Sequence, residues 1–147
     1  MGPALITKAL DHYFDQGDYL REDRLRGVAF TPVFVDRGDP TGWDLDHTGM
    51  VADSAWHDWD LSAIVPDGAV AVLLGVHIAN TSATQSLMFR KNGNVNNFNI
   101  AEARTQVATV YNDTDVIVAC DQNRVIEYWL ALGGTWLVYL TVRGWWK

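Results

Sequence analysis

The longest apolar run of the sequence, residues 69–79, limits the possible folds more than any other segment. Its side chains alternate between two faces, and both faces are largely apolar, as in a strand that is covered on both sides. The turn-forming triplet Pro66-Asp67-Gly68 and the β-branched residues of the run favour a strand over a helix. We therefore expect a central strand. One face would carry Val70, Val72, Leu74, Val76 and Ile78, and the other Ala71, Leu73, Gly75 and His77.

Turn signals divide the chain after residue 53 into short segments of similar length. Asn92-Gly93 is the strongest hairpin signal, because both residues tolerate a positive φ angle. No intervening segment is long and periodic enough to form a crossover helix, so the strands should be antiparallel. The pattern predicts an all-β protein, an antiparallel eight-stranded β-sandwich that is jelly-roll-like. The expected strands are 55–61, 69–79, 86–91, 94–100 (a short strand or an irregular rim), 105–111, 115–120, 124–130 and 135–143.

The first 52 residues differ in pattern from the rest. Apolar residues spaced i, i+4, i+7 and i+8 predict one short helix within residues 1–26. A helix of about ten residues is marginal alone, so its apolar stripe needs a partner surface, on this chain or on another subunit. Residues 27–52 are expected to form at best an edge strand, interrupted by Pro32, and a loop. We therefore expect an attachment arm, 1–52, and a β-sandwich domain, 53–147. The residues expected to dock the arm are Ile6, Leu10, Tyr13 and Phe14.

Composition excludes several classes of partner. A chain of 147 residues corresponds to one domain, and its net charge of −7 argues against a nucleic-acid partner, which attracts clustered Lys and Arg. No apolar stretch reaches the roughly 18 residues of a membrane span, so we expect no membrane insertion. The single cysteine, Cys120, lies in an apolar run and is expected to be a small buried residue.

Four segments of the C-terminal two thirds carry a family resemblance: AWHDWDLSAIVPDGAVAVLLGV, FRKNGN, VYNDTDVIVACDQNRVIEYW and VRGWWK. In this order they resemble a small β-sandwich domain of tailed-bacteriophage virion proteins, which occurs in tail fibres and other surface-displayed components. The resemblance covers about residues 53–147. It implies a structural or receptor-facing protein located in the virion and present in several copies, often as a homotrimer. Residues 1–52 would then attach the protein to the capsid, neck or tail through other virion proteins.

Seven tryptophans make this composition unusual. Large aromatic rings serve in cores and at interfaces, and they also form platforms for sugars, so composition leaves both roles open. Trp145 and Trp146 are adjacent at a strand end, and we expect one to face inward and the other outward. An alternative function is therefore a glycan- or receptor-binding module that recognises the host cell surface. The candidate residues for a subunit interface or a glycan contact are Trp56, His77, Trp129, Trp145 and Trp146.

The expected hairpin around Asn92-Gly93 is polar and rich in hydrogen-bonding groups. It is either a solvated loop or an exposed tip that contacts a receptor; the lack of carboxylates argues against calcium. The residues assigned to this exposed tip are Arg90, Lys91, Asn92 and Asn94.

The sequence lacks the usual signatures of an enzyme or a metal site. No His-x-His pair with a nearby Glu is present, and His57 and Asp58 are neighbours that point to opposite faces of a strand. Asp58 and Asp60 share a face, and Glu127 could lie near them, but no catalytic triad or nucleotide-binding motif accompanies them. We expect no enzymatic activity, no bound metal and no cofactor.

Overall fold

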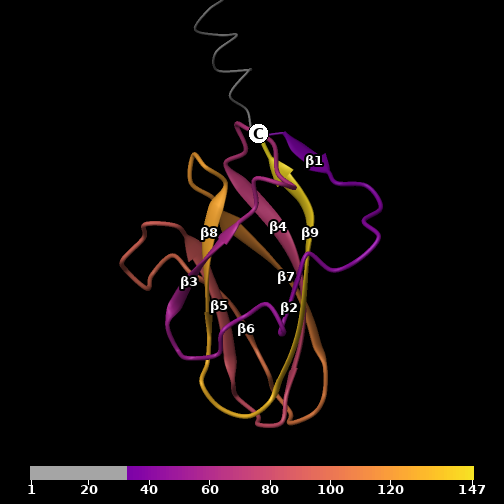
Figure 1. Ribbon diagram of the computed structural model, residues 1–147, viewed down its shortest axis with the longest axis vertical. Coiled ribbons are helices and arrows are strands. Elements are labelled where there is room, and N and C mark those ends of the chain that lie inside the picture. The colour runs from indigo at the N-terminus through magenta and orange to yellow at the C-terminus, as the bar shows by residue number, and fades with distance from the viewer. Residues whose placement is uncertain (1–32) are drawn as a thin grey trace, which may run out of the picture. The chain divides into compact units, whose positions relative to one another are not determined.

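The computed structural model describes residues 33–147, which form an all-β unit of nine strands in two antiparallel sheets (Figure 1). The first sheet has the order β1-β9-β4-β7, with β2 also paired to β9, and the second has the order β3-β8-β5-β6. No helix occurs in residues 33–147. The bounds are β1 (Phe34–Asp36), β2 (Leu45–Asp46), β3 (Trp56–Asp60), β4 (Ala71–Asn80), β5 (Ser86–Lys91), β6 (Ala101–Arg104), β7 (Asn112–Ala119), β8 (Val125–Leu130) and β9 (Trp136–Trp146).

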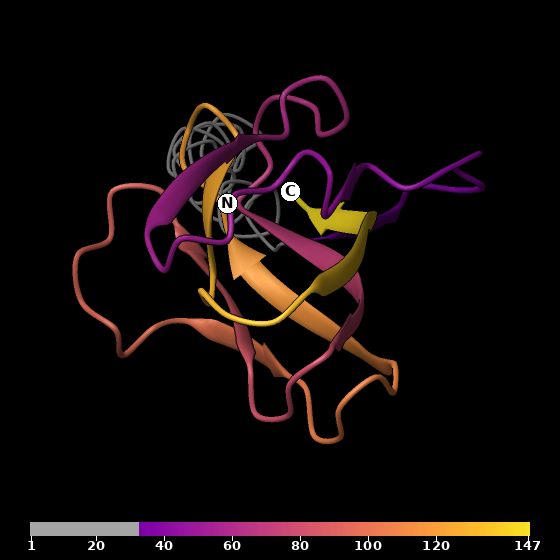
Figure 2. The same cartoon turned by 60° about the horizontal axis from the view of Figure 1, so that its bottom comes forward.

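The chain crosses between the two sheets at almost every connection. After β2 it passes to β3 in the second sheet, returns for β4, and crosses again for β5. Only β5 and β6 are consecutive neighbours in one sheet, joined by the 92–100 loop, which projects from the body in Figures 1 and 2. Within each sheet, most neighbouring strands are therefore far apart in the sequence.

The expectation of two antiparallel β layers is confirmed, and most strands lie where the alternation places them. The prediction for 86–91 matches β5, and those for 55–61, 69–79 and 124–130 match β3, β4 and β8 within two residues. The short helix expected in residues 1–26, with Ile6, Leu10, Tyr13 and Phe14, lies outside the described residues.

Residues 94–100, expected as a short strand or an irregular rim, form an irregular loop, whereas the prediction of a strand at 105–111 is wrong. β6 lies between them, and both segments are loops. The apparent alternation of 105–111 does not build a buried face, because Val107 and Val110 are 58% and 54% exposed. Thr109 has a φ of 62°, and its N–H bonds to the Asn80 carbonyl at 2.8 Å, so this segment turns over the end of β4.

Two strands fall in the region that the sequence assigns to the attachment arm. β1 pairs with the end of β9, with Phe34 opposite Trp146, and β2 pairs with its middle, with Leu45 opposite Leu140. The carboxylate of Asp44 accepts the Val142 N–H at 2.7 Å and forms an ion pair with Arg37. Residues 34–46 are thus part of the first sheet, and the compact unit begins at Val33 rather than at residue 53.

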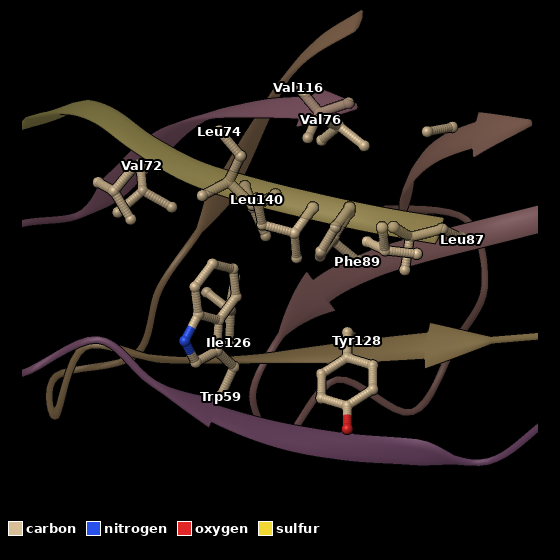
Figure 3. Close-up of a cluster of buried hydrophobic side chains, with 14 of the residues drawn as sticks. Trp59, Val72, Leu74, Val76, Leu87, Phe89, Val116, Ile126, Tyr128 and Leu140 are labelled. Carbon is tan, nitrogen blue, oxygen red and sulfur yellow. The ribbon is translucent and has the colours of Figure 1, made fainter. Parts of the chain in front are cut away.

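The core lies between the sheets and uses the face of the central strand that the sequence indicates. Figure 3 shows side chains from β4 and β9 meeting side chains from β3, β5 and β8. The alternation fails only at Val70, which precedes β4 and is 51% exposed. Cys120 is buried as expected, and this burial raises the pKa of its thiol. The inward residues of β4 are Val72, Leu74, Val76 and Ile78, each at most 2% exposed.

A β-bulge in β9 decides which of the adjacent tryptophans faces the core. Leu74 pairs with Val142, but the preceding Leu73 pairs with Gly144, so Arg143 is an extra residue. The bulge reverses the alternation beyond it. Trp145 therefore lies opposite the inward-facing Val72 and packs against the core, whereas Trp146 lies opposite Ala71 on the outer face. The expectation that one ring faces inward and the other outward agrees with this arrangement.

We expect Gly144→Ala to destabilise the protein by about 1–3 kcal/mol, the usual cost of overpacking. A β-carbon at residue 144 would lie 2.5 Å from the Val35 carbonyl oxygen and would overlap the Phe34 ring, so β1 would have to move. Urea unfolding measures the effect. Gly42→Ala is the matched control, because a β-carbon there has no heavy atom within 4 Å. Equal unfolding midpoints for the two variants would contradict this account of the bulge.

A second prediction concerns the Asp121 carboxylate, which ties the β7–β8 turn to the β5–β6 hairpin. Its oxygens accept the N–H groups of Asn123 and Val125, at 2.9 and 2.8 Å, and the Asn92 side-chain amide at 2.9 Å. Partial burial raises the pKa of Asp121, but the bonds from Val125, Asn92 and Asn123 outweigh it, so the pKa lies below the ordinary 3.8.

Asp121→Asn should therefore lower the free energy of unfolding by about 1 kcal/mol at neutral pH. A carboxylate with a lowered pKa stabilises the fold fully above pH 3.8, and this contribution is lost as the pH falls through its folded value. The difference in unfolding free energy between wild type and variant should thus stay constant from pH 6 to pH 3.8 and shrink as the pH falls further. A difference that also stays constant below pH 3.8 would show that the charge of Asp121 contributes nothing.

Candidate functional site

The outer face of the first sheet divides into two chemically different halves. At one end, Ala71, Leu73 and Ile117 stand on adjacent strands and form, with Trp146 and Phe34, a surface that we call the apolar patch, completed by Ala119. At the other end, the outward residues carry aromatic rings and charges. We call this second half the aromatic site, made of Trp43, His77, Tyr111, Asp113, Tyr139, Thr141 and Arg143.

His77 lies at the centre of the aromatic site. Its ring stacks on Tyr111, with 4.1 Å between centroids and an interplanar angle of 13°. Trp43 lies parallel to His77 at 6.1 Å, and Tyr139 contacts both, with centroids 5.9 Å from His77 and 5.4 Å from Trp43. Trp43 and Tyr111 are 57% and 43% exposed. Rings from two strands and two loops thus form one partly open surface.

Hydrogen bonds of backbone and side-chain groups fix the two loops that supply rings to this site. Trp43 precedes Asp44, whose N–H bonds to the Leu140 carbonyl at 2.8 Å and whose carboxylate holds β9. Tyr111 precedes Asn112, whose side-chain amide donates to the Arg104 carbonyl at 2.9 Å. Both rings are therefore held by neighbouring residues that are bound to strands.

Charged and hydroxyl groups surround the rings. Nδ1 of His77 is hydrogen-bonded to the Asp113 carboxylate, and Nε of Arg143 lies 3.1 Å from the Asp115 carboxylate. Burial, together with the neighbouring Tyr139, raises the pKa of Tyr111 above 10.0, so its hydroxyl keeps its proton at neutral pH. The site therefore offers both donors and acceptors.

A depression of about 290 Å³ lies among Trp43, His77, Asp113, Thr141 and Arg143. Gly75 lies between them, and its missing side chain makes room for Arg143, because a β-carbon there would overlap the guanidinium group. This is an open, amphipathic hollow next to an exposed aromatic ring. Such a combination suits a small ligand with one apolar face and several polar groups.

The outer face of the second sheet carries a different arrangement. Trp56 lies opposite Trp129, and the guanidinium carbon of Arg90 lies 4.0 Å from the centroid of the Trp56 ring. Arg90 also pairs with Glu127, at 2.6 and 3.3 Å, and the two side chains are only 11% and 13% exposed. Asp58 is the register partner of Glu127. The carboxylates of Asp58 and Glu127 are therefore neighbours on this face. The Glu127 carboxylate is already paired with the Arg90 guanidinium group.

The residues that the sequence singled out do not form one site. His77 belongs to the aromatic site and Trp146 to the apolar patch, whereas Trp56 and Trp129 lie on the other sheet. Trp145 packs against the core, and its indole N–H has no partner among residues 33–147.

The assignment of Arg90 to an exposed tip is wrong, because Glu127 and Trp56 hold its side chain against the second sheet. Asn92 is partly buried and bonds to Asp121. Lys91 and Asn94 form the turn, where the Asn94 N–H bonds to the Lys91 carbonyl at 3.1 Å. Lys91 is exposed, in agreement with its assignment, and Asn94 is half-buried. The exposed surface continues through residues 95–99, where Phe98 is 99% exposed.

Sequence reasoning missed most of the aromatic site. Tyr139 could be placed outward from the alternation of its strand, but Trp43 and Tyr111 lie in loops whose partners are distant in sequence. Within residues 33–147, no three His, Cys, Asp or Glu side chains gather to hold a metal ion, and no helix could cross a membrane. The sequence matches no protein-family model and no curated protein.

Proposed function

We propose that the protein is a structural, non-enzymatic component of a tailed-bacteriophage virion, displayed on the particle surface as a homotrimer. The proposal rests on the resemblance of residues 53–147 and on the strand order. Jelly rolls, which include many viral capsid domains, are built from eight strands in two sheets. If β1 and β2 are counted as one interrupted strand, the orders β1-β9-β4-β7 and β3-β8-β5-β6 give the same arrangement, two sheets of four strands each.

Hydrogen bonds around the interruption support this count. β1 and β2 both pair antiparallel with β9, and residues 37–44 loop out between them. The loop is closed at both ends, by the Arg37 N–H to the Arg143 carbonyl at 3.0 Å and by the Asp44 N–H to the Leu140 carbonyl at 2.8 Å. We propose that one jelly-roll strand carries an inserted loop at this point.

The observation that carries the oligomer proposal is the apolar patch. An outer sheet face that meets water normally carries polar side chains. In this patch the outward residues are apolar instead, with Ile117 60% and Phe34 41% exposed and the Phe34 and Trp146 rings 4.9 Å apart. A contiguous exposed apolar surface of this kind is typical of a subunit interface. In the proposed trimer, each copy buries its patch against its neighbours.

Charges placed in the apolar patch should dissociate the trimer. We expect wild type to have about three times the mass of one chain by size-exclusion chromatography with light scattering, and Ile117→Glu and Trp146→Glu to shift it to monomer. The control is Val95→Glu, at an 82% exposed valine in the 92–100 loop, which should stay trimeric. Far-ultraviolet circular dichroism checks that the variants are folded. A wild-type monomer at micromolar concentration would refute the oligomer, since obligate interfaces are large and apolar.

The proposed attachment function belongs to the arm, where Ile6, Leu10, Tyr13 and Phe14 would dock on other proteins of the capsid, neck or tail. Deleting residues 1–26 should leave a folded oligomer that no longer joins particles. Incorporation is measured by the amount of protein that copurifies with virions. Undiminished incorporation of the deletion variant would contradict the assignment of attachment to this segment.

A second candidate function is recognition of a host-surface glycan. The aromatic site favours it, because an exposed tryptophan lies beside a hollow bordered by carboxylate, hydroxyl and guanidinium groups. This role is compatible with the structural one, since the aromatic site and the apolar patch occupy different ends of one sheet face.

A further inference from the structure

We infer that the aromatic site binds a neutral sugar, with one pyranose ring packed on Trp43 and its hydroxyl groups directed toward Asp113, Thr141 and Arg143. The inference rests on the second candidate function and specifies its ligand class and residues. It is independent of the oligomeric state.

Trp43 provides the platform. It is the only tryptophan of residues 33–147 whose ring is largely exposed, and its contact with Tyr139 and its parallel arrangement with His77 hold it in place. The negative face of an aromatic ring attracts the weakly positive C–H groups that line one side of a pyranose. Because the ring is already fixed, a ligand does not have to immobilise it on binding.

The polar groups complement hydroxyls. A sugar hydroxyl both donates and accepts, so a matching site needs acceptors and donors side by side. Asp113 is an acceptor whose side chain is 74% exposed, and only its Oδ1 contacts His77. Arg143 is held through its Nε by Asp115, and its guanidinium group borders the same hollow as the Thr141 hydroxyl. Two vicinal hydroxyls can therefore find an acceptor and donors within one depression.

The charges of the site favour a neutral sugar over an acidic one. The charged groups of the site already have partners. The Arg143 guanidinium group pairs with the Asp115 carboxylate, and the Asp113 carboxylate contacts the His77 ring. A sugar carboxylate or sulfate would approach two aspartates, on a chain whose net charge is −7. Neutral hydroxyls avoid this repulsion and still use the same hydrogen-bonding groups.

The hollow also has room for the next sugar of a chain. A second depression of about 300 Å³ adjoins it, because Asp113 lines both. The second depression is polar, with Glu102, Arg104, Gln106 and Asn112 around it. A sugar on Trp43 would thus continue past Asp113 into a region that offers hydrogen bonds but no aromatic platform. We therefore expect a disaccharide to bind more tightly than its monosaccharide.

The test uses the full chain on an array of neutral hexose and N-acetylhexosamine glycans, with sialylated and sulfated glycans alongside. The best neutral disaccharide is then titrated by isothermal calorimetry. We expect saturable binding that Trp43→Ala weakens by more than about tenfold, the effect of losing a central aromatic contact. Asp113→Asn, which keeps the side-chain shape, should also weaken binding. Phe98→Ala is the matched control, because it removes a fully exposed ring far from the site in sequence and should leave affinity unchanged.

Three results would overturn the inference: no saturable binding to any neutral glycan, unchanged affinity in Trp43→Ala, or a preference for acidic glycans. Light scattering on the same samples separates this outcome from the structural proposal. A trimer that binds no glycan refutes the sugar site alone, and a glycan-binding monomer refutes the trimer alone.

Discussion

The pairing of β4 with β9 is the interaction on which the rest of the structure depends. The two strands pair from Ala71 to Asn80, and their inward side chains form one wall of the core. β9 also pairs with β1 and β2, and β4 with β7, so every strand of the first sheet contacts this pair. If the register of this pair slipped by one residue, the apolar side chains would face solvent, so burial fixes the register strongly.

One irregularity in this pairing shapes both surfaces of the sheet. The bulge at Arg143 adds a residue to β9, which turns Trp145 into the core and Trp146 outward. The same bulge lies at the boundary between the two outer halves. On one side of it, Trp146 meets Phe34 in the apolar patch. On the other side, Arg143 extends over Gly75 toward Asp115 and borders the hollow of the aromatic site. A single inserted residue therefore separates an apolar surface from an amphipathic one.

The parts of the fold that sequence could predict are those in which burial repeats every second residue. β4, β5 and β8 were predictable for this reason, because their inward residues belong to one continuous core. β1 lies in the stretch that was expected to form at best an edge strand, but its partner could not be predicted, and β2 was missed. These strands of three and two residues pair with a segment about a hundred positions later. The segment 105–111 failed for the opposite reason, since its alternation is not matched by burial.

The same distinction applies to the candidate site. His77 could be singled out because it stands alone among small residues on one face of a strand. Its partners Trp43, Tyr111 and Tyr139 come from three other segments, and no local pattern joins them. Arg90 was misplaced because its partner Glu127 lies 37 positions away, across a strand pair that sequence alone does not reveal.

The two halves of the outer face have complementary consequences in the proposed assembly. In the proposed assembly, burying the apolar patch between copies would remove from solvent the most apolar part of the sheet, where the Trp146 indole N–H is the one polar side-chain group. The aromatic site lies toward the opposite end of the same strands, so it can remain open when the patch is covered. Binding of one neutral sugar in a shallow hollow is weak, because few contacts offset the entropy of association. In the proposed trimer, three linked copies would convert later binding events into intramolecular ones, which would raise the overall affinity without any new contact. Oligomerisation through one half of the sheet would thus supply the avidity that the other half needs.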